Sequence, residues 1–442
     1  MLHRVTLLLV SLSLIGFLAG TVWVVPFLLV SACSAYAILF FCNKFKNDKP
    51  RLWSAYVFSA LCTAAFVTAQ YQGLIGTLNG DTGSLINQSA LTLGLPFYML
   101  QVIGLYFDVL VKRIQLPSLL SFQNLIVYFP KFLSGPLEEN KPFLEQLERF
   151  RFNYDAKRID DGFSWVVLGV LFKFCLSGPL DRYVFRDELY DPLIIMISAT
   201  MLEFRLYFDL AGYSFIVYGI SRMLGVELTL NFNHPFLSKN VRDFWKNWHI
   251  SLGRWFHNYL YVPLRRKTPN KAHAHLVLPL FVFLISAMWH GITFNFLLWG
   301  TFHGLVFVLF ITFLHRFDWP RWAGLIGLWC FLIFGRLLFM ESDADLMIQK
   351  LASVFSADRW VESIKNSPQL LHDLGLAAGF RLGMVFYPIV AMSFVFLEYK
   401  SKKYYPDNPY YLFRTGWGFL GCLILIMALI SSDLQGFIYA RQ

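Results

Sequence analysis

The chain has 442 residues, of which 57% are hydrophobic and only 15% are charged. Soluble domains carry about 25% charged residues and about 45–50% apolar ones. Because the apolar excess recurs along the whole length, it excludes a soluble domain with one buried core and predicts an all-α polytopic membrane protein. The formal net charge of +10 lies largely in short loops between apolar runs. We therefore expect membrane lipids, and no nucleic acid, as partners of these loops.

Apolar stretches that approach the length of a spanning helix, about 20 residues, recur from one end of the chain to the other. Eleven such stretches cover residues 5–20, 22–42, 52–72, 89–111, 163–180, 192–217, 275–291, 293–314, 322–340, 379–397 and 411–431. The first resembles a signal peptide, but apolar character continues to Cys42, which favours an uncleaved span. We therefore predict about 11 transmembrane helices in a single integral membrane domain, residues 1–442.

The basic loops predict the orientation of these spans. Lys and Arg cluster in residues 44–51, 112–113, 239–271 and 400–403. With eleven spans, all four clusters fall on the same side of the membrane. Because cytoplasmic loops are enriched in Lys and Arg, we expect the N-terminus inside and the C-terminus outside.

Three segments do not have the pattern of plain spans. Residues 119–137 are apolar but interrupted by prolines and a glycine, which is typical of a re-entrant or interfacial segment. Residues 138–161 have the pattern of an amphipathic interfacial helix, and residues 241–264 interleave aromatic and basic side chains, as a helix at headgroup level does. Irregular backbone at membrane depth is tolerated only when it is buried in protein or lines a cavity. We therefore predict re-entrant or interfacial helices around a central funnel or tunnel.

Ionisable side chains interrupt the apolar run that begins at residue 192. Arg205 and Asp209 are four residues apart, so they share a helix face and could neutralise each other, and Glu203 and Tyr213 lie in the same run. One interpretation is the polar wall of a cavity. The other is a structural ion pair between helices.

The histidines His249, His290 and His303 lie in or beside apolar segments, where an imidazole is costly unless it has polar partners or does chemistry. One alternative is a structural histidine; the functional ones are proton relay, metal site and general base. No Asp or Glu lies within four residues of His290 and no HExxH occurs, which disfavours a metal, and the absence of GxSxG disfavours a serine hydrolase. A histidine without its own nucleophile suits a transfer reaction in which a substrate hydroxyl attacks.

The runs DFWKNWHISLGRWFHNYLYVPL, MWHG and WGTFHG together resemble the membrane-bound O-acyltransferase (MBOAT) family. The upstream runs LGLPFYMLQVIGLYFDV, YFPKFLSGPLEENKPFLEQL and YFDLAGYSFIVYGISRMLGVELTLNFNHPF resemble its earlier blocks. The resemblance is to the bacterial branch that holds alginate O-acetylation and teichoic-acid D-alanyl transfer proteins. It covers residues 90–315 as a catalytic core, whereas the flanking residues 1–85 and 316–442 match only by hydropathy.

The resemblance implies roles for matched residues. His290, in MWHG, corresponds to the family's catalytic histidine, and His249, in NWHIS, to its second motif histidine near the cytoplasmic mouth of a tunnel. Many members carry Arg-Asp where this chain has His257 and Asn258. Six further residues are expected along the substrate tunnel: His303, Asn295, Trp248, Trp289, Tyr213 and Asp209. Five cations are expected to dock the donor or a partner: Arg242, Lys246, Arg254, Arg265 and Arg266.

The activity implied by the resemblance is O-acyl transfer across a bacterial cytoplasmic membrane, by a multi-pass protein without a bound cofactor or metal. The acyl group, of acetyl or D-alanyl type, would come from acyl-CoA or an acyl carrier protein on the cytoplasmic side. The acceptor would be a hydroxyl of an extracytoplasmic polysaccharide or teichoic-acid-like polymer, reached directly or through an extracytoplasmic acyltransferase partner. Two alternatives stay open: a proton-coupled transporter or flippase of an envelope intermediate, and a scaffold that anchors a carrier or partner through residues 138–161 and 241–271.

Overall fold

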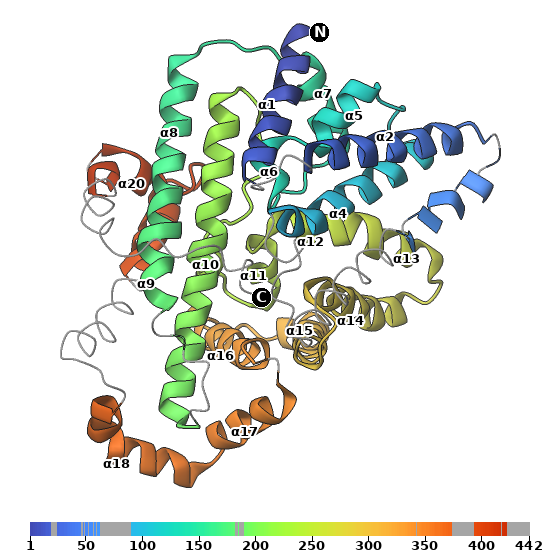
Figure 1. The fold of residues 1–442 in the computed structure, drawn as a ribbon. Coiled ribbons are helices and arrows are strands. Elements are labelled where there is room, and N and C mark those ends of the chain that lie inside the picture. The colour runs from blue at the N-terminus through green and yellow to red at the C-terminus, as the bar shows by residue number, and fades with distance from the viewer. Residues whose placement is uncertain are drawn as a thin grey trace, which may run out of the picture. The chain divides into compact units, whose positions relative to one another are not determined.

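The structure, a computed structural model, describes residues 1–18, 24–61, 90–181, 184, 190–341, 343–373 and 393–421, apart from 46, 48, 52, 56, 59 and 417. Every regular element in these residues is a helix (Figure 1). Within this described part of the chain, four helices are long and apolar enough to cross a membrane: Val25–Asn43, Ala156–Leu180, Phe294–Arg316 and Arg321–Phe339. Shorter apolar helices cover Leu2–Leu18, Gly94–Leu110 and Ala274–His290. The all-α membrane class is therefore supported, but the count of eleven spans is not confirmed. The predicted stretch 192–217 lies in the helix Pro192–Met223, which is not among these four. The stretches 52–72 and 379–397 lie largely, and 411–431 partly, outside the described residues.

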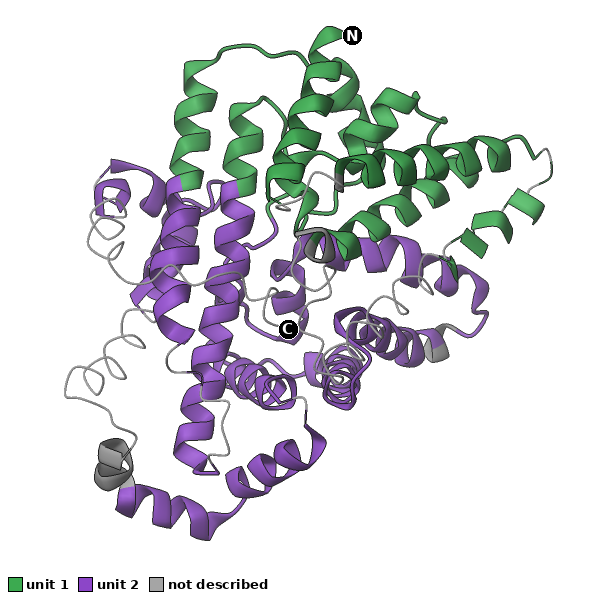
Figure 2. Cartoon of the chain, viewed as in Figure 1, with its two compact units in different colours: residues 1–166, 217–230, 439–442 green, residues 167–216, 231–438 purple. Residues whose placement is uncertain are grey.

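The chain forms two compact units, coloured separately in Figure 2. Unit 1 holds residues 1–166, 217–230 and 439–442, and unit 2 holds residues 167–216 and 231–438. The long helices α8 (Ala156–Val170) and α10 (Pro192–Met223) each contribute residues to both units.

Unit 1 is built on apolar helices followed by short, interrupted ones. Its elements besides the parts of α8 and α10 are α1 (Leu2–Leu18), α2 (Val24–Asn43), α4 (Ala90–Leu110), α5 (Leu119–Ile126), α6 (Phe129–Phe132) and α7 (Asn140–Arg149). The predicted interruption of residues 119–137 is confirmed, because α5 and α6 are separate and Gly135 has a φ of +80° that only glycine adopts without strain.

The expectation of one interfacial helix over residues 138–161 is wrong. Helix α7 ends at Arg149, residues 150–155 are not helical, and α8 then begins at Ala156 and continues as an apolar helix to Leu180. The apolar face of α7 is also covered by protein, since Phe143 and Leu147 are each only 1% exposed. The amphipathic pattern of α7 thus reflects packing within unit 1.

A buried polar chain joins α4, α6 and α7. The Lys131 ammonium donates to Gln101 Oε1 at 2.8 Å, and Gln101 Nε2 donates to Asn140 Oδ1 at 2.7 Å. Asn140 Nδ2 in turn donates to Asp108 Oδ2 at 2.8 Å, and Asp108 pairs with Arg113 at 3.1 Å. Buried polar groups are stable when they are hydrogen-bonded in this way. This hydrogen-bond network therefore stabilises the packing of the interrupted segment, residues 119–137, against α4.

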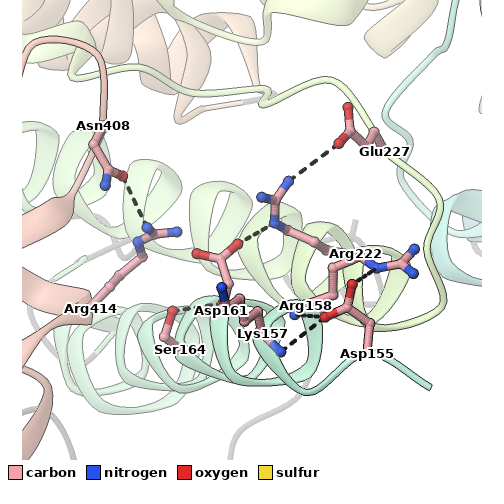
Figure 3. Close-up of polar contacts among 9 residues, drawn as sticks. All are labelled: Asp155, Lys157, Arg158, Asp161, Ser164, Arg222, Glu227, Asn408 and Arg414. Atoms are coloured by element: carbon pink, nitrogen blue, oxygen red, sulfur yellow. Dashed lines mark hydrogen bonds and ion pairs between the residues drawn. The ribbon is translucent and has the colours of Figure 1, made fainter.

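Ion pairs stabilise the start of α8 and the end of α10 in unit 1 (Figure 3). Asp155 accepts backbone bonds at the start of α8 and pairs with Arg158 at 2.9 Å. Arg222 contacts the Asp161 carboxylate and lies 3.6 Å from Glu227. Both contacts of Arg222 are partly exposed, so each contributes at most about 1 kcal/mol.

Close approach of α8 and α10 depends on glycines. In unit 1, a Cβ on Gly162 would lie 2.6 Å from the Gly219 carbonyl oxygen. In unit 2, a Cβ on Gly169 would lie 2.6 Å from the Gly212 carbonyl oxygen. Because backbone atoms cannot move aside as a flexible side chain can, these positions require glycine.

Unit 2 contains the rest of α8, which continues into a π-helical segment, η1 (Leu171–Ser177), and then α9 (Gly178–Leu180). It also contains the rest of α10. Short helices then cover η3 (Pro235–Leu237), α11 (Val241–Asn247), α12 (Ile250–Phe256), η4 (His257–Tyr261) and α13 (Val262–Lys267). Longer and peripheral helices follow: α14 (Lys271–His290), α15 (Phe294–Thr312), η5 (Leu314–Arg316), α16 (Arg321–Phe339), α17 (Ala344–Val354), α18 (Ala357–Asp373) and α20 (Tyr411–Arg414), with residues 393–404 also helical.

The predicted headgroup helix over residues 241–264 is also wrong as a single element. His249 has a φ of +45° and separates α11 from α12, and η4 is wound as a π-helix. Trp248 is only 7% exposed and packs against Phe232 and Phe244, with ring centroids 5.2 and 5.3 Å away. Aromatic residues of this segment therefore contribute to the core of unit 2 and do not all lie at a lipid surface.

Candidate active site

His249 sits in a strained turn that a neighbouring loop holds in place. A non-glycine residue in the left-handed region costs about 1–2 kcal/mol, so the surroundings must enforce it. Asn231 does so by accepting two backbone N–H groups: Ile250 donates to its main-chain oxygen at 2.9 Å and Ser251 to its side-chain oxygen at 3.0 Å. The loop around Asn231 thus determines where the His249 imidazole lies.

The same loop is anchored by a buried hydroxyl and carboxylate network. Tyr410 Oη accepts the His234 backbone N–H at 3.0 Å, and Tyr207 Oη donates to Glu398 at 2.7 Å. The His234 ring lies 3.4 Å from the other Glu398 oxygen, and the two tyrosine hydroxyls are 3.0 Å apart. All four side chains are at most 1% exposed. Residues from α10, the 231–234 loop and the C-terminal region therefore share one rigid cluster.

His290, the last residue of α14, lies among aromatic rings. Its ring centroid is 4.9 Å from that of Trp289, 5.7 Å from Trp299, 6.1 Å from Phe339 and 6.2 Å from Phe296. In spite of these neighbours the residue is only half-buried. A partly accessible imidazole in an aromatic wall can accept a proton from a group that enters the site.

Arg336 brings a positive charge to the same place. Its guanidinium pairs through Nε with the Glu203 carboxylate and lies 5.3 Å from the centre of the Phe339 ring and 5.8 Å from that of Trp248. The Phe339 ring also neighbours His290, with the two ring centroids 6.1 Å apart, and Trp248 immediately precedes His249. The fold thus brings together two histidines and an arginine that are far apart in the sequence.

His303 and Asn295 flank this group on α15. The His303 ring is 4.5 Å from Trp299 and 4.4 Å from Phe331, it is 2% exposed, and neither of its nitrogens has a hydrogen-bond partner within the described part of the chain. Asn295 accepts from the Thr293 hydroxyl and donates to the Phe339 carbonyl at 3.3 Å, which ties the start of α15 to the end of α16.

Asp209 is part of a buried ion pair. It pairs with Lys173 of η1, while Arg205 pairs with Asp181 at 3.0 Å. Arg205 and Asp209 therefore do not neutralise each other, as their spacing suggested. Each forms an ion pair with a residue outside α10, because the packing of neighbouring segments places Asp181 and Lys173 beside them. Tyr213, on the same helix, is 8% exposed.

The cations expected to dock a donor lie on α11, α12 and α13 of unit 2. Arg242, Lys246 and Arg266 are exposed, and Arg254 and Arg265 are half-buried. Lys246 is 3.8 Å from Asp243, a weak exposed pair that leaves most of its charge available. Among the residues that the structure describes, there is no group of three or more His, Cys, Asp or Glu side chains that could hold a metal ion.

Sequence reasoning missed Arg336 and its pairing with Glu203. Arg336 interrupts the run FLIFGRLLF, and an ionisable residue inside such a run marks a functional site by default. This signal lies outside residues 90–315, to which the motif resemblance is confined. Glu203 was noted as a polar interruption, although its partner could not be identified from helical spacing.

The sequence was compared with known proteins. A model described as MBOAT, membrane-bound O-acyltransferase family, matches residues 17–340. The chain is 28% identical over 306 residues to a probable alginate O-acetylase of Azotobacter vinelandii, covering 65% of this chain and 58% of the relative. It is 26% identical to a teichoic acid D-alanyltransferase of Streptococcus thermophilus, over 60% of this chain and 66% of the relative.

A peptidoglycan O-acetyltransferase of Helicobacter pylori is 31% identical over 199 residues, which cover 43% of this chain and 37% of the relative. The chain therefore spans less than two thirds of the length of these curated relatives.

Proposed function

Because this chain belongs to the membrane-bound O-acyltransferase family, we propose that it transfers an acyl group from a thioester to a hydroxyl, with His290 as general base. The observation that carries the proposal is the half-buried His290 ring in an aromatic wall, next to the Phe339 ring, which also lies 5.3 Å from the Arg336 guanidinium carbon. The names of the relatives, which describe O-acetyl and D-alanyl transfer, support the same reaction class.

In the proposed reaction the acceptor hydroxyl gives its proton to His290 as its oxygen attacks the thioester carbonyl carbon. General-base assistance of this kind contributes about 10²–10⁴-fold to the rate. The aromatic rings around His290 would exclude water that hydrolyses the donor.

His249 would serve as a neutral hydrogen-bonding group. Burial lowers the pKa of His249 to about 4, so its ring is uncharged at neutral pH.

The donor in this proposal is acyl-CoA or an acyl carrier protein on the cytoplasmic side of a bacterial cytoplasmic membrane. The exposed cations Arg242, Lys246 and Arg266 support an anionic donor, since positive surface charge raises the encounter rate with anions. The acyl group would be acetyl or D-alanyl, and the acceptor an extracytoplasmic polysaccharide or cell-wall polymer, reached directly or through an extracytoplasmic partner.

The test uses purified full-length protein with labelled acetyl and D-alanyl thioesters of coenzyme A and of carrier protein. We expect thioester consumption that depends on a hydroxyl acceptor, and a loss of about 10²-fold or more in His290→Gln. His315→Gln, at an exposed histidine of η5, is the matched control. A transporter or flippase would consume no thioester, and a scaffold would tolerate the His290 substitution. Either result would overturn the proposal.

A further inference from the structure

Arg336 has hydrogen-bonding capacity that its buried ion pair does not use. Its Nε donates to Glu203, and neither terminal nitrogen donates to any other residue that the structure describes. The side chain keeps 9% exposure, while that of Glu203 has none. A guanidinium presents five N–H donors in a fixed fork, so most of them remain available here.

The Arg336 guanidinium lies next to residues of the candidate active site. Phe339 lies 5.3 Å from the guanidinium carbon and its ring centroid is 6.1 Å from that of His290. Trp248, the residue before His249, lies 5.8 Å from the same carbon. Arg336 thus shares the neighbour Phe339 with His290, lies near the residue that precedes His249, and is paired with a carboxylate.

We infer that Arg336 is a further catalytic residue, which binds the carbonyl oxygen of the acyl donor and stabilises the oxyanion that forms there. This inference rests on the proposed acyl transfer. As the acceptor oxygen bonds to the carbonyl carbon, the π electron pair moves onto the carbonyl oxygen and the hydroxyl proton moves to His290. When the C=O bond re-forms, the C–S bond breaks, and the leaving thiolate takes the proton from His290.

Donors aimed at a developing oxyanion contribute about 10²–10³-fold to kcat, because their dipoles or charges are already oriented. Glu203 is a positioning residue in this scheme, since a side chain with no exposed surface cannot touch a substrate. Because Glu203 binds Nε, both terminal nitrogens of Arg336 stay available to a substrate. The competing explanation is that the pair only joins α10 to α16.

The test compares an acetyl thioester with the matching dithioester, in which sulfur replaces the carbonyl oxygen and accepts hydrogen bonds poorly. We expect the full-length wild-type protein to prefer the oxygen donor strongly. The substitution Arg336→Met should lower kcat on the thioester about 10²–10³-fold with little change in KM. The variant should also lose most of the preference for the thioester over the dithioester. Arg336→Lys should be intermediate, because a single ammonium cannot reproduce the fork.

Leaving Glu203 buried without its partner can prevent folding, so the double variant Arg336→Met with Glu203→Met provides a second measurement. Replacing a buried ion pair by apolar residues of similar volume often preserves stability. If the pair is only structural, this folded double variant regains wild-type kcat and oxygen preference, and the inference is overturned. If Arg336 binds the oxyanion, the double variant folds and stays slow.

Lys350→Met removes the cation of another buried pair in unit 2, Lys350 with Glu341 at 3.1 Å, and should keep the oxygen preference. A wild-type protein that consumes no thioester would count against the proposed function itself. A wild type that does, combined with an unchanged oxygen preference in Arg336→Met, would count against the role of Arg336 alone.

Discussion

Gly335 of α16 lies directly against the imidazole of His303 on α15, so that a Cβ at position 335 would overlap the Nε2 atom. The ring itself is confined by Trp299, Trp245 and Phe331, at centroid distances of 4.5, 5.4 and 4.4 Å. It therefore has little room to move away. Gly335 immediately precedes Arg336, so a shift of α16 at this contact would also move the arginine.

Gly335→Ala should lower the thermal stability of the protein and its transfer rate. Overpacking typically costs about 1–3 kcal/mol. The matched control is Gly327→Ala on the same helix, where an added Cβ meets no atom within 4 Å. In a helix that change should be neutral or stabilising by up to about 1 kcal/mol. Melting temperatures of the purified variants would check this, and equal melting temperatures for the two would contradict the contact.

The pH dependence of stability should reveal the buried His249. Its folded-state pKa is about 4, against about 6.5 for an unperturbed histidine. Between those values the unfolded chain binds a proton that the native state does not, so the free energy of unfolding falls as pH drops from 6.5 and levels off below 4. The difference approaches about 3 kcal/mol.

His249→Asn is the comparison for this measurement, because asparagine tolerates the left-handed conformation at φ +45° and does not titrate. As the solution is acidified from pH 6.5 to pH 4, the melting temperature of the wild-type protein should therefore fall further than that of the variant. Parallel curves would show that His249 is not buried as a neutral ring.

Asn231→Ala should disturb the turn that carries His249. The substitution removes the side-chain acceptor of the Ser251 N–H and leaves a buried donor unsatisfied, at a cost of about 1–3 kcal/mol. We expect transfer activity to fall more than stability alone explains. Asn240→Ala, which removes the N-cap of α11 through its bond with the Asp243 N–H, costs a comparable amount, about 1 kcal/mol. The transfer activity per folded molecule is the measurement that distinguishes the two variants. An equal loss of that activity in both would argue against a special role for Asn231.

Tyr410→Phe should weaken the buried cluster behind the 231–234 loop. The change removes the acceptor of the His234 N–H and a neighbour of the Tyr207 hydroxyl, at a cost of about 1–3 kcal/mol. Tyr411→Phe, at the adjacent and less buried tyrosine, is the control and should be nearly neutral. Hydrogen exchange of the 231–251 segment would report the loosening, and unchanged protection there would show that the cluster does not hold the loop.

Local features of the sequence determined the helical membrane class and the interruption of residues 119–137, because hydropathy, proline and glycine act within a few residues of where they occur. Only the tertiary structure decided which side chains meet. Glu203 and Arg336 are 133 residues apart in the sequence, yet they form one buried ion pair. Helical spacing linked Arg205 to Asp209, whereas packing between helices gave them Asp181 and Lys173. An ion pair depends on which helices lie side by side, and a single sequence carries no local signal of that choice.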